Sequence, residues 1–165
     1  MKKILFMLPM MVTLFLFTSC SKDEGSESQT FFVNVYTQAK SIYDDGNTEK
    51  KLGEDANVYL FKSDGGKIDT QKSAESIANS SVLTYTDGTT SKQAEYKITN
   101  NPGVFNFENI SNGQYVLWVE YNFGYGVTYH SSKNINVNND YRGKTEEKIF
   151  TTSIADKGFY RYQNW

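Results

Sequence analysis

The chain has one cysteine, one histidine and two prolines among its 165 residues. Because Cys20 is the single cysteine, an intrachain disulfide is excluded and the fold must depend on its hydrophobic core. His130 has no second histidine or further cysteine with which to complete a zinc site, so we expect it on the surface or on an edge strand. No G-x-S-x-G nucleophile motif occurs either. We therefore expect no metal, no cofactor and no enzymatic activity.

The chain also lacks a large excess of charge of either sign. The 17 basic and 19 acidic side chains give a net charge of −2, and no basic cluster stands out. A nucleic-acid-binding protein needs such a cluster, so we exclude nucleic acid as a partner. A polybasic patch for anionic lipids is missing as well, so any attachment to a membrane needs another source.

The first nineteen residues have the pattern of a cleavable export signal. Lys2 and Lys3 are followed by an apolar stretch, residues 4–17, and then by small residues that end at Cys20. A helix over residues 4–18 would rise roughly 22 Å, which is shorter than the hydrocarbon core of about 30 Å. A permanent transmembrane helix is therefore the weaker interpretation. We predict a signal peptide at 1–19, a flexible tether at 20–29 and one domain at 30–165.

Residues 16–20 read Leu-Phe-Thr-Ser-Cys and resemble the lipobox of bacterial lipoproteins, from which they depart at Phe17. The resemblance implies cleavage before Cys20 and a lipid on its thiol. The alternative is an ordinary secretory signal that leaves a free thiol.

Lys22, Asp23 and Glu24 follow Ser21 directly after this cysteine. They resemble the export tag of surface lipoproteins in glycan-foraging Gram-negative anaerobes, which implies the outer face of the outer membrane. The alternatives are a plain solvated linker and a lipoprotein that faces the periplasm.

Side chains alternate between apolar and polar over most of the remaining chain, which predicts half-buried strands. The expected strands are residues 31–36, 57–62, 82–86, 94–99, 104–108, 115–122, 127–131, 134–137 and 146–152. Turn residues such as Gly65, Gly88 and Gly113 separate them, and residues 73–80 have room for a helical turn or two of little structural weight. We predict an all-β fold, an antiparallel two-layer β-sandwich of immunoglobulin-like or transthyretin-like type with eight or nine strands.

Residues 103–110 read Gly-Val-Phe-Asn-Phe-Glu-Asn-Ile, and residues 113–117 read Gly-Gln-Tyr-Val-Leu. This pair of segments resembles the G-x-F-x-F-x-N-I-x-x-G-x-Y-x-L hairpin of transthyretin-like sandwiches, which include Cna-B-type repeats and the regulatory domains of carboxypeptidases and outer-membrane receptors. The resemblance implies that Phe105 and Phe107 fill the core from one strand and Tyr115 and Leu117 from the next.

Some Cna-B-type domains form a Lys–Asn isopeptide bond with the help of an acidic core residue four positions after the motif tyrosine. That position holds Val119 here, and Glu120 one residue later points to the opposite face of its strand. We therefore expect no isopeptide crosslink.

Aromatic side chains supply the candidates for contact with a ligand or partner. Trp118 lies opposite the face that carries Tyr115 and Leu117, and residues 159–165 read Phe-Tyr-Arg-Tyr-Gln-Asn-Trp. Rings beside amides and a guanidinium form surfaces that stack on sugars or bury a protein partner. Our candidates are Trp118, Tyr160, Tyr162 and Trp165. The alternative is that these rings cover the ends of the sandwich.

Three acidic pairs are weaker candidates for calcium or glycoside chemistry, and we interpret them as solvated loop charge. They are Asp44-Asp45, Glu54-Asp55 and Glu146-Glu147.

Three functions stay open at this stage. The first is a non-enzymatic surface lipoprotein that binds a glycan or a surface protein as an accessory of an outer-membrane uptake or adhesion complex. The second is a carbohydrate-binding module that uses the exposed aromatics. The third is a structural subunit of a pilus. Lipoprotein pilins are usually cleaved at an Arg or Lys that follows a propeptide, and the only arginines here, Arg142 and Arg161, lie late in the chain, which disfavours this function.

Overall fold

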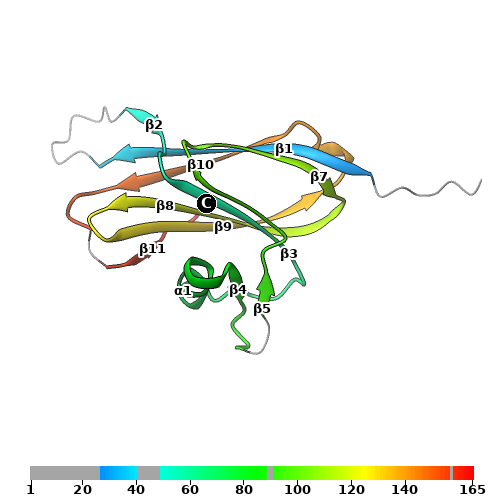
Figure 1. The fold of residues 1–165 in the computed structure, drawn as a ribbon, viewed down its shortest axis with the longest axis horizontal. Coiled ribbons are helices and arrows are strands. Elements are labelled where there is room, and N and C mark those ends of the chain that lie inside the picture. Colours follow the sequence, from blue (N-terminus) through cyan, green and yellow to red (C-terminus); the bar gives the residue numbers. More distant parts are fainter. Residues whose placement is uncertain (1–26, 41–48, 89–90, 157) are drawn as a thin grey trace, which may run out of the picture.

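Two sheets packed face to face make up the body of the computed structural model (Figure 1), which describes residues 27–40, 49–88, 91–156 and 158–165. The first sheet has the order β10-β1-β2, with β7 paired to β1, and the second has the order β11-β9-β8-β3-β6. Strands β4 and β5 form a separate hairpin. The fold is thus the predicted all-β sandwich.

The strands are β1 (Ser28–Ala39), β2 (Lys50–Leu52), β3 (Ala56–Lys62), β4 (Val82–Thr84), β5 (Ser91–Gln93), β6 (Tyr96–Asn101), β7 (Val104–Ser111), β8 (Gly113–Gly124), β9 (Val127–Val137), β10 (Thr145–Thr152) and β11 (Tyr160–Tyr162). The helices are α1 (Thr70–Ser80) and the 3-10 turn η1 (Asn139–Tyr141). Most strands fall where alternation predicts them. The short strands β2, β5 and β11 were not predicted, and the two strands expected at 127–131 and 134–137 are one, β9.

The inner core fills the space between the two sheets. Phe31, Val33 and Val35 enter it from β1, while Leu117 and Val119 enter it from β8, and all five are fully buried. This arrangement follows from strand geometry, because successive side chains point to opposite faces of a sheet.

The Gly103–Ile110 and Gly113–Leu117 segments fill the core as the motif implies, but they do not pair as a hairpin. Strand β7 pairs with β1 in the first sheet, whereas β8 pairs with β3 and β9 in the second. The turn between β7 and β8 therefore carries the chain from one sheet to the other. Gly103 is required where it stands, since its φ is +87° and an added Cβ would lie 2.6 Å from the carbonyl oxygen of Val35.

Two strand pairs correct the expectation of a wholly antiparallel sandwich. Strand β1 runs parallel to β10, and β9 runs parallel to β11. Neither pair is consecutive in the chain, so no tight turn forces an antiparallel partner on it. The prediction from turn signals covered only neighbours in sequence.

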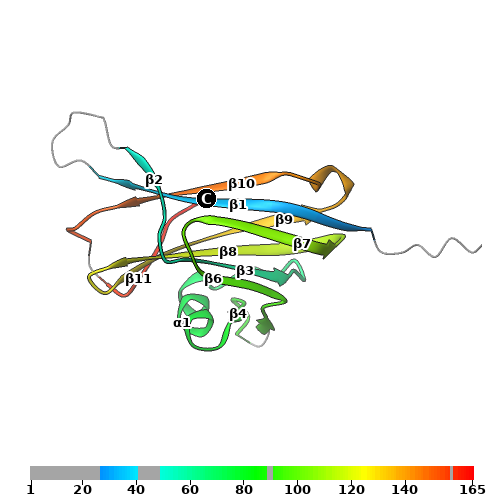
Figure 2. The ribbon, with the colours of Figure 1, turned by 45° about the horizontal axis from the view of Figure 1, so that its top comes forward.

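Helix α1 corrects the prediction of a helical turn or two without structural weight. It covers eleven residues, begins at the N-cap Asp69, whose side chain accepts a hydrogen bond from the Lys72 amide, and ends at Ser81 in the left-handed conformation. Figure 2 shows α1 and the neighbouring β4 below the second sheet, on the side away from β1 and β10. None of the described helices has the length and apolar character needed to cross a membrane.

A second core lies between α1, the β4–β5 hairpin and the outer face of the second sheet. Its buried residues are Tyr59, Phe61, Ala74, Ile77, Leu83, Tyr85, Val116 and Trp118. The helix is also tied down by Ser73, whose hydroxyl donates to the carbonyl oxygen of Thr84 at 2.9 Å. Strand β8 is therefore covered on both faces, which explains its unbroken buried run from Tyr115 to Glu120.

Residues 163–165 connect the edges of the two sheets. The Gln163 amide nitrogen donates to the carbonyl oxygen of His130 in β9 at 2.9 Å. The Gln163 side chain pairs with the backbone of Thr151 in β10, accepting from its N–H at 3.1 Å and donating to its carbonyl oxygen at 2.7 Å. A side-chain amide thus takes the place of a neighbouring strand along part of β10.

Replacing Ile77 with alanine tests whether α1 belongs to the folded core. We expect Ile77→Ala to lower the free energy of unfolding by roughly 2–5 kcal/mol, because it leaves a cavity between α1 and β8. The exposed Asn79 on the same helix gives the control, and Asn79→Ala is expected to change stability by about 0.5 kcal/mol or less. Urea unfolding followed by tryptophan fluorescence measures both. Equal stability of the two variants would contradict the packing of α1.

Candidate functional site

A pocket of about 480 Å³ lies between helix α1 and strand β11. Its volume falls within the range of about 300–1,000 Å³ that is typical of small-molecule sites. The lining residues are Thr70, Gln71 and Glu75 from α1, His130 from β9, and Phe159, Tyr160 and Tyr162 from the segment that forms β11.

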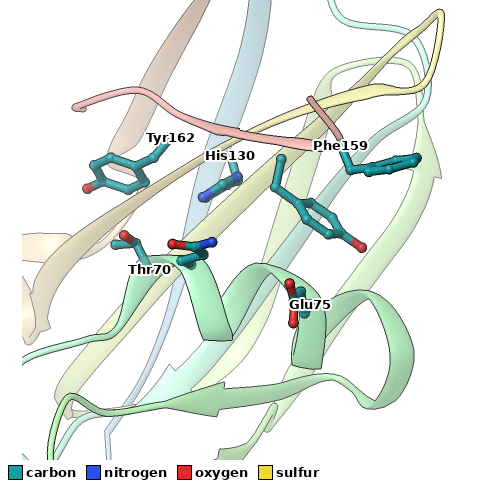
Figure 3. A pocket seen from close by; sticks show the side chains of 7 residues that line it. Thr70, Glu75, His130, Phe159 and Tyr162 are labelled. Carbon is teal, nitrogen blue, oxygen red and sulfur yellow. The ribbon is translucent and has the colours of Figure 1, made fainter. Parts of the chain in front are cut away.

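The register of β11 against β9 places the aromatic side of the pocket. Tyr160 pairs with Thr128, and Tyr162 pairs with His130, so these side chains point to the outer face of the second sheet. The His130 ring lies 5.5 Å from the Tyr162 ring and 6.3 Å from the Tyr160 ring. Figure 3 shows His130 between Tyr162 and Phe159, across from Thr70 and Glu75. Phe159 remains 79% exposed and offers an open ring at the rim.

His130 is the polar residue at the floor of this pocket. Its side chain is only 2% exposed, and neither of its ring nitrogens has a hydrogen-bond partner in the protein. Burial lowers the pKa of His130 from 6.5 to about 4. The imidazole is therefore neutral near pH 7, with one nitrogen as a hydrogen-bond donor and the other as an acceptor.

A buried polar cluster holds His130 in place from behind. The Trp118 indole stacks on the His130 ring at 5.1 Å with an interplanar angle of 13°, and its Nε1 donates to Glu120 Oε1 at 3.1 Å. Glu120 lies directly across from His130 in the register of β8 and β9 and is 4% exposed. Burial raises the pKa of Glu120 to about 7, although hydrogen bonds from Trp118 and Tyr59 act in the opposite direction.

The wall opposite the aromatics comes from the first turns of α1. Gln71 and Glu75 are four residues apart and so lie on the same helical face, beside Thr70. Glu75 is the one charged side chain among the seven lining residues. The Asp69 carboxylate caps the start of α1 by accepting from the Lys72 amide at 3.1 Å. The helix start beside the pocket thus already carries a negative partner.

The four aromatic residues predicted as contacts do not converge. Tyr160 and Tyr162 line the pocket, and Tyr162 is 40% exposed. The prediction of Trp118 as a surface contact was wrong, because α1 covers it and leaves it 0% exposed. Trp165 also lies elsewhere, packed against the inner core with the Lys133 ammonium 5.3 Å from its ring centre. The expectation that His130 lies on the surface or an edge was wrong too, since β9 is flanked by β8 and β11.

Sequence reasoning missed the helical wall of the pocket. The signal was present in Asp69, a good N-cap residue, followed by the apolar Ala74 and Ile77 at helical spacing. Recognising that helix would have placed Gln71 and Glu75 on one face. The position of His130 had no such signal, because it depends on the parallel pairing of two strands that are distant in sequence.

The acidic pairs do not form a second site among the described residues. Glu147 is exposed and pairs with Lys50 at 3.1 Å, and Glu54 and Asp55 lie in an exposed turn. Asp44 and Asp45 lie outside the described residues. Within residues 27–40, 49–88, 91–156 and 158–165, no group of three His, Cys, Asp or Glu side chains is placed to hold a metal ion.

Glu146 is buried rather than solvated, which corrects its interpretation as loop charge. It accepts from Lys133 at 2.5 Å and from the Tyr141 hydroxyl at 2.6 Å, and Lys144 lies 3.2 Å away. Burial acts to raise the pKa of Glu146, but these partners outweigh it and lower the pKa. The cluster satisfies itself and is structural.

The predicted lipid site Cys20 and the predicted export tag Lys22, Asp23 and Glu24 lie outside the described residues. Both stay predictions.

Replacing Glu120 with glutamine tests the buried carboxyl group behind the pocket. A folded pKa of about 7 against 4.5 for the ordinary carboxyl means that the folded state holds a proton that the unfolded state releases between those pH values. Stability therefore falls as the pH rises from 4.5 to about 7. We expect the melting temperature of Glu120→Gln to rise increasingly above that of the wild type over this range. The corresponding difference in the free energy of unfolding should reach on the order of 3 kcal/mol at pH 8.

Thermal melts from pH 4 to pH 8 provide the measurement. Glu108→Gln, which changes an exposed carboxylate on β7, is the control and should track the wild type at every pH. A constant difference between Glu120→Gln and the wild type would show that Glu120 ionises as an ordinary carboxyl group.

No protein-family model matches the chain, and no characterised protein matches its sequence. Among solved structures it is similar to the SpaA pilin of Corynebacterium diphtheriae in complex with a signal peptide, with 13% identity, a TM-score of 0.43, and coverage of 76% of this chain and 98% of the pilin chain. A proposed carbohydrate-binding protein of Pseudomonas aeruginosa is similar with 16% identity, a TM-score of 0.36, and coverage of 78% and 93%. Likeness at this level says nothing about function.

Proposed function

We propose that the chain is a lipid-anchored, non-enzymatic binding module of the bacterial cell surface, and that its ligand enters the pocket between α1 and β11. One observation carries the proposal: a small-molecule-sized pocket with three aromatic residues in its lining and an unpartnered, buried His130 at its floor. Deeply buried polar atoms without partners are rare in folded proteins, so the two His130 nitrogens call for a partner from outside the chain.

The position of the pocket fits attachment through residues that precede β1. Strand β1 begins at one end of the sandwich, and β11 lies toward the opposite end (Figures 1 and 2). A protein held by a lipid on Cys20 would therefore carry the pocket at the end of the domain farther from its anchor. This orientation suits a module that collects a ligand for an uptake or adhesion complex.

The lining residues favour binding over catalysis. Glycoside hydrolysis uses two carboxyl groups on either side of the scissile bond, and the lining contains one, Glu75. A histidine acting as a general base needs a proton-bearing group within hydrogen-bond reach, and neither nitrogen of His130 is hydrogen-bonded to any such group in the described part of the chain.

Within this function, the composition of the pocket favours a carbohydrate ligand. The apolar faces of sugar rings pack against aromatic rings, which Phe159, Tyr160 and Tyr162 supply. Sugar hydroxyls need donors and acceptors at fixed places, which the amide of Gln71 and the carboxylate of Glu75 supply from the helix. The carbohydrate-binding alternative from the sequence is thus retained, with its site moved from Trp118 and Trp165 to this pocket.

Cell fractionation tests the anchor and the location. We expect the wild-type protein to partition into detergent and to be degraded when intact cells are treated with protease. Cys20→Ala should shift the protein to the aqueous phase, because no lipid can be attached. Replacing Lys22, Asp23 and Glu24 with alanine should leave the protein lipidated but protected from protease inside the cell. Full protection of the wild type would rule out surface display.

Affinity electrophoresis in gels that contain soluble polysaccharides tests glycan binding. We expect the wild type to be retarded, and Tyr162→Ala to bind about tenfold more weakly because a ring is lost from the pocket wall, which corresponds to about 1.4 kcal/mol. Tyr125→Ala is a matched control, since Tyr125 is 88% exposed and lies outside the pocket.

Tyr125→Ala should migrate like the wild type. If both variants lost retardation equally, general surface aromaticity rather than the pocket would explain binding. If the wild type showed no retardation on any polysaccharide, the carbohydrate-binding form of the function would fail.

A further inference from the structure

We propose that the pocket between α1 and β11 is specific for an uncharged sugar residue, whose hydroxyl groups pair with the two ring nitrogens of His130. The inference rests on the proposed glycan-binding function and names the chemical class of the ligand. Four features of the pocket carry it: the two unpaired ring nitrogens of His130, the charge of the lining, the fixed orientation of the imidazole and the arrangement of the walls.

The two unpaired ring nitrogens of His130 offer one hydrogen-bond donor and one acceptor. Both ring nitrogens are buried without a partner in the protein. An unpaired buried polar atom costs about 1–3 kcal/mol, so a ligand that pairs both nitrogens recovers that cost on binding. Hydroxyl groups can both donate and accept, and a ring that carries several of them can satisfy both nitrogens at once.

The charge of the lining disfavours an acidic sugar in particular. Glu75 is the one charged residue among the lining side chains, and no lysine or arginine is part of the lining. The start of α1, which would otherwise attract an anion, is occupied by the Asp69 carboxylate. An anion in the pocket would therefore meet the Glu75 carboxylate, and Lys72, the nearest cation on the helix start, is already paired with Asp69 at 3.7 Å.

The orientation of the imidazole is set before a ligand arrives. Trp118 stacks on one face of the His130 ring, and the hydrogen bond from Trp118 Nε1 to Glu120 fixes the indole in turn. Tyr160 packs against the second core and meets the ring at 72°. A ligand does not have to order these groups, and this saves the entropy that a mobile side chain would cost.

The walls leave a slot with an aromatic side and a polar side. Phe159 and Tyr162 stand on either side of His130, while Thr70 and Glu75 stand across from it on α1 (Figure 3). A sugar ring placed between these walls can stack one face on an aromatic ring and direct hydroxyl groups toward His130 and the helix. Neutral sugars fit both requirements without leaving a buried charge.

Ligand-observed NMR on the membrane-extracted, full-length mature protein tests the inference. The probes are the methyl glycosides of glucose, galactose and mannose, the corresponding uronic acids, and the corresponding 2-amino sugars. We expect at least one neutral glycoside to bind at least tenfold more tightly than its uronic acid, because the lining offers the carboxylate of Glu75 and no cation.

Two variants test the role of His130. His130→Phe keeps a ring against Trp118 but removes both hydrogen-bonding nitrogens, and it should bind the neutral glycoside at least tenfold more weakly. Gln71→Ala, on the exposed face of α1, removes one polar group without touching a core and should weaken binding severalfold. A thermal melt of each variant checks that it is folded, and Tyr125→Ala should bind as the wild type does.

The outcomes separate this inference from the function on which it rests. Preferential binding of a charged sugar, or unchanged binding by a folded His130→Phe, would overturn the inference and leave glycan binding in place. Failure of every neutral and charged probe, together with no retardation on polysaccharides, would overturn both.

Discussion

The double-sided burial of strand β8 is the constraint on which the rest of the structure depends. Its inner face faces the first sheet of the sandwich, and its outer face carries Val116 and Trp118, which are too apolar to remain in water. The chain therefore needs a cover for the outer face of the second sheet, and α1 and the β4–β5 hairpin supply it. The pocket lies where α1 meets β11, the edge strand of this sheet, without closing completely.

The outer layer differs from the inner core in its use of polar groups. Burial shifts the pKa values of two facing groups in opposite directions. It lowers the pKa of His130 to about 4 and raises that of Glu120 to about 7, and each shift favours the neutral form. At pH 6, both are therefore largely neutral although they lie across from each other in the same sheet. The layer behind the pocket is consequently a low-charge environment, which suits hydrogen bonding to a neutral ligand more than ion pairing.

Much of the fold could be predicted from alternation, since it depends on local side-chain order. The inward faces of β1, β7 and β8 follow directly from residues such as Phe31, Phe105 and Leu117. The pairing of β1 with β10 and of β9 with β11 could not be predicted, because no turn joins those strands. Most of the candidate site was missed: Thr70, Gln71 and Glu75 because helix α1 was not recognised, and His130 because of this pairing. Tyr160 and Tyr162 were found from composition, whereas His130 acquires its place only through the register of two distant strands.

The Gln163 side chain that pairs with Thr151 has a consequence for encounters between copies of the chain. An open strand edge would let neighbouring molecules join sheet to sheet. In β10 the amide of Gln163 occupies the backbone groups of Thr151 that such a neighbour would use. The same residue is bound to His130 through its backbone. Keeping the molecules separate and holding the pocket floor in place are thus tasks of a single glutamine.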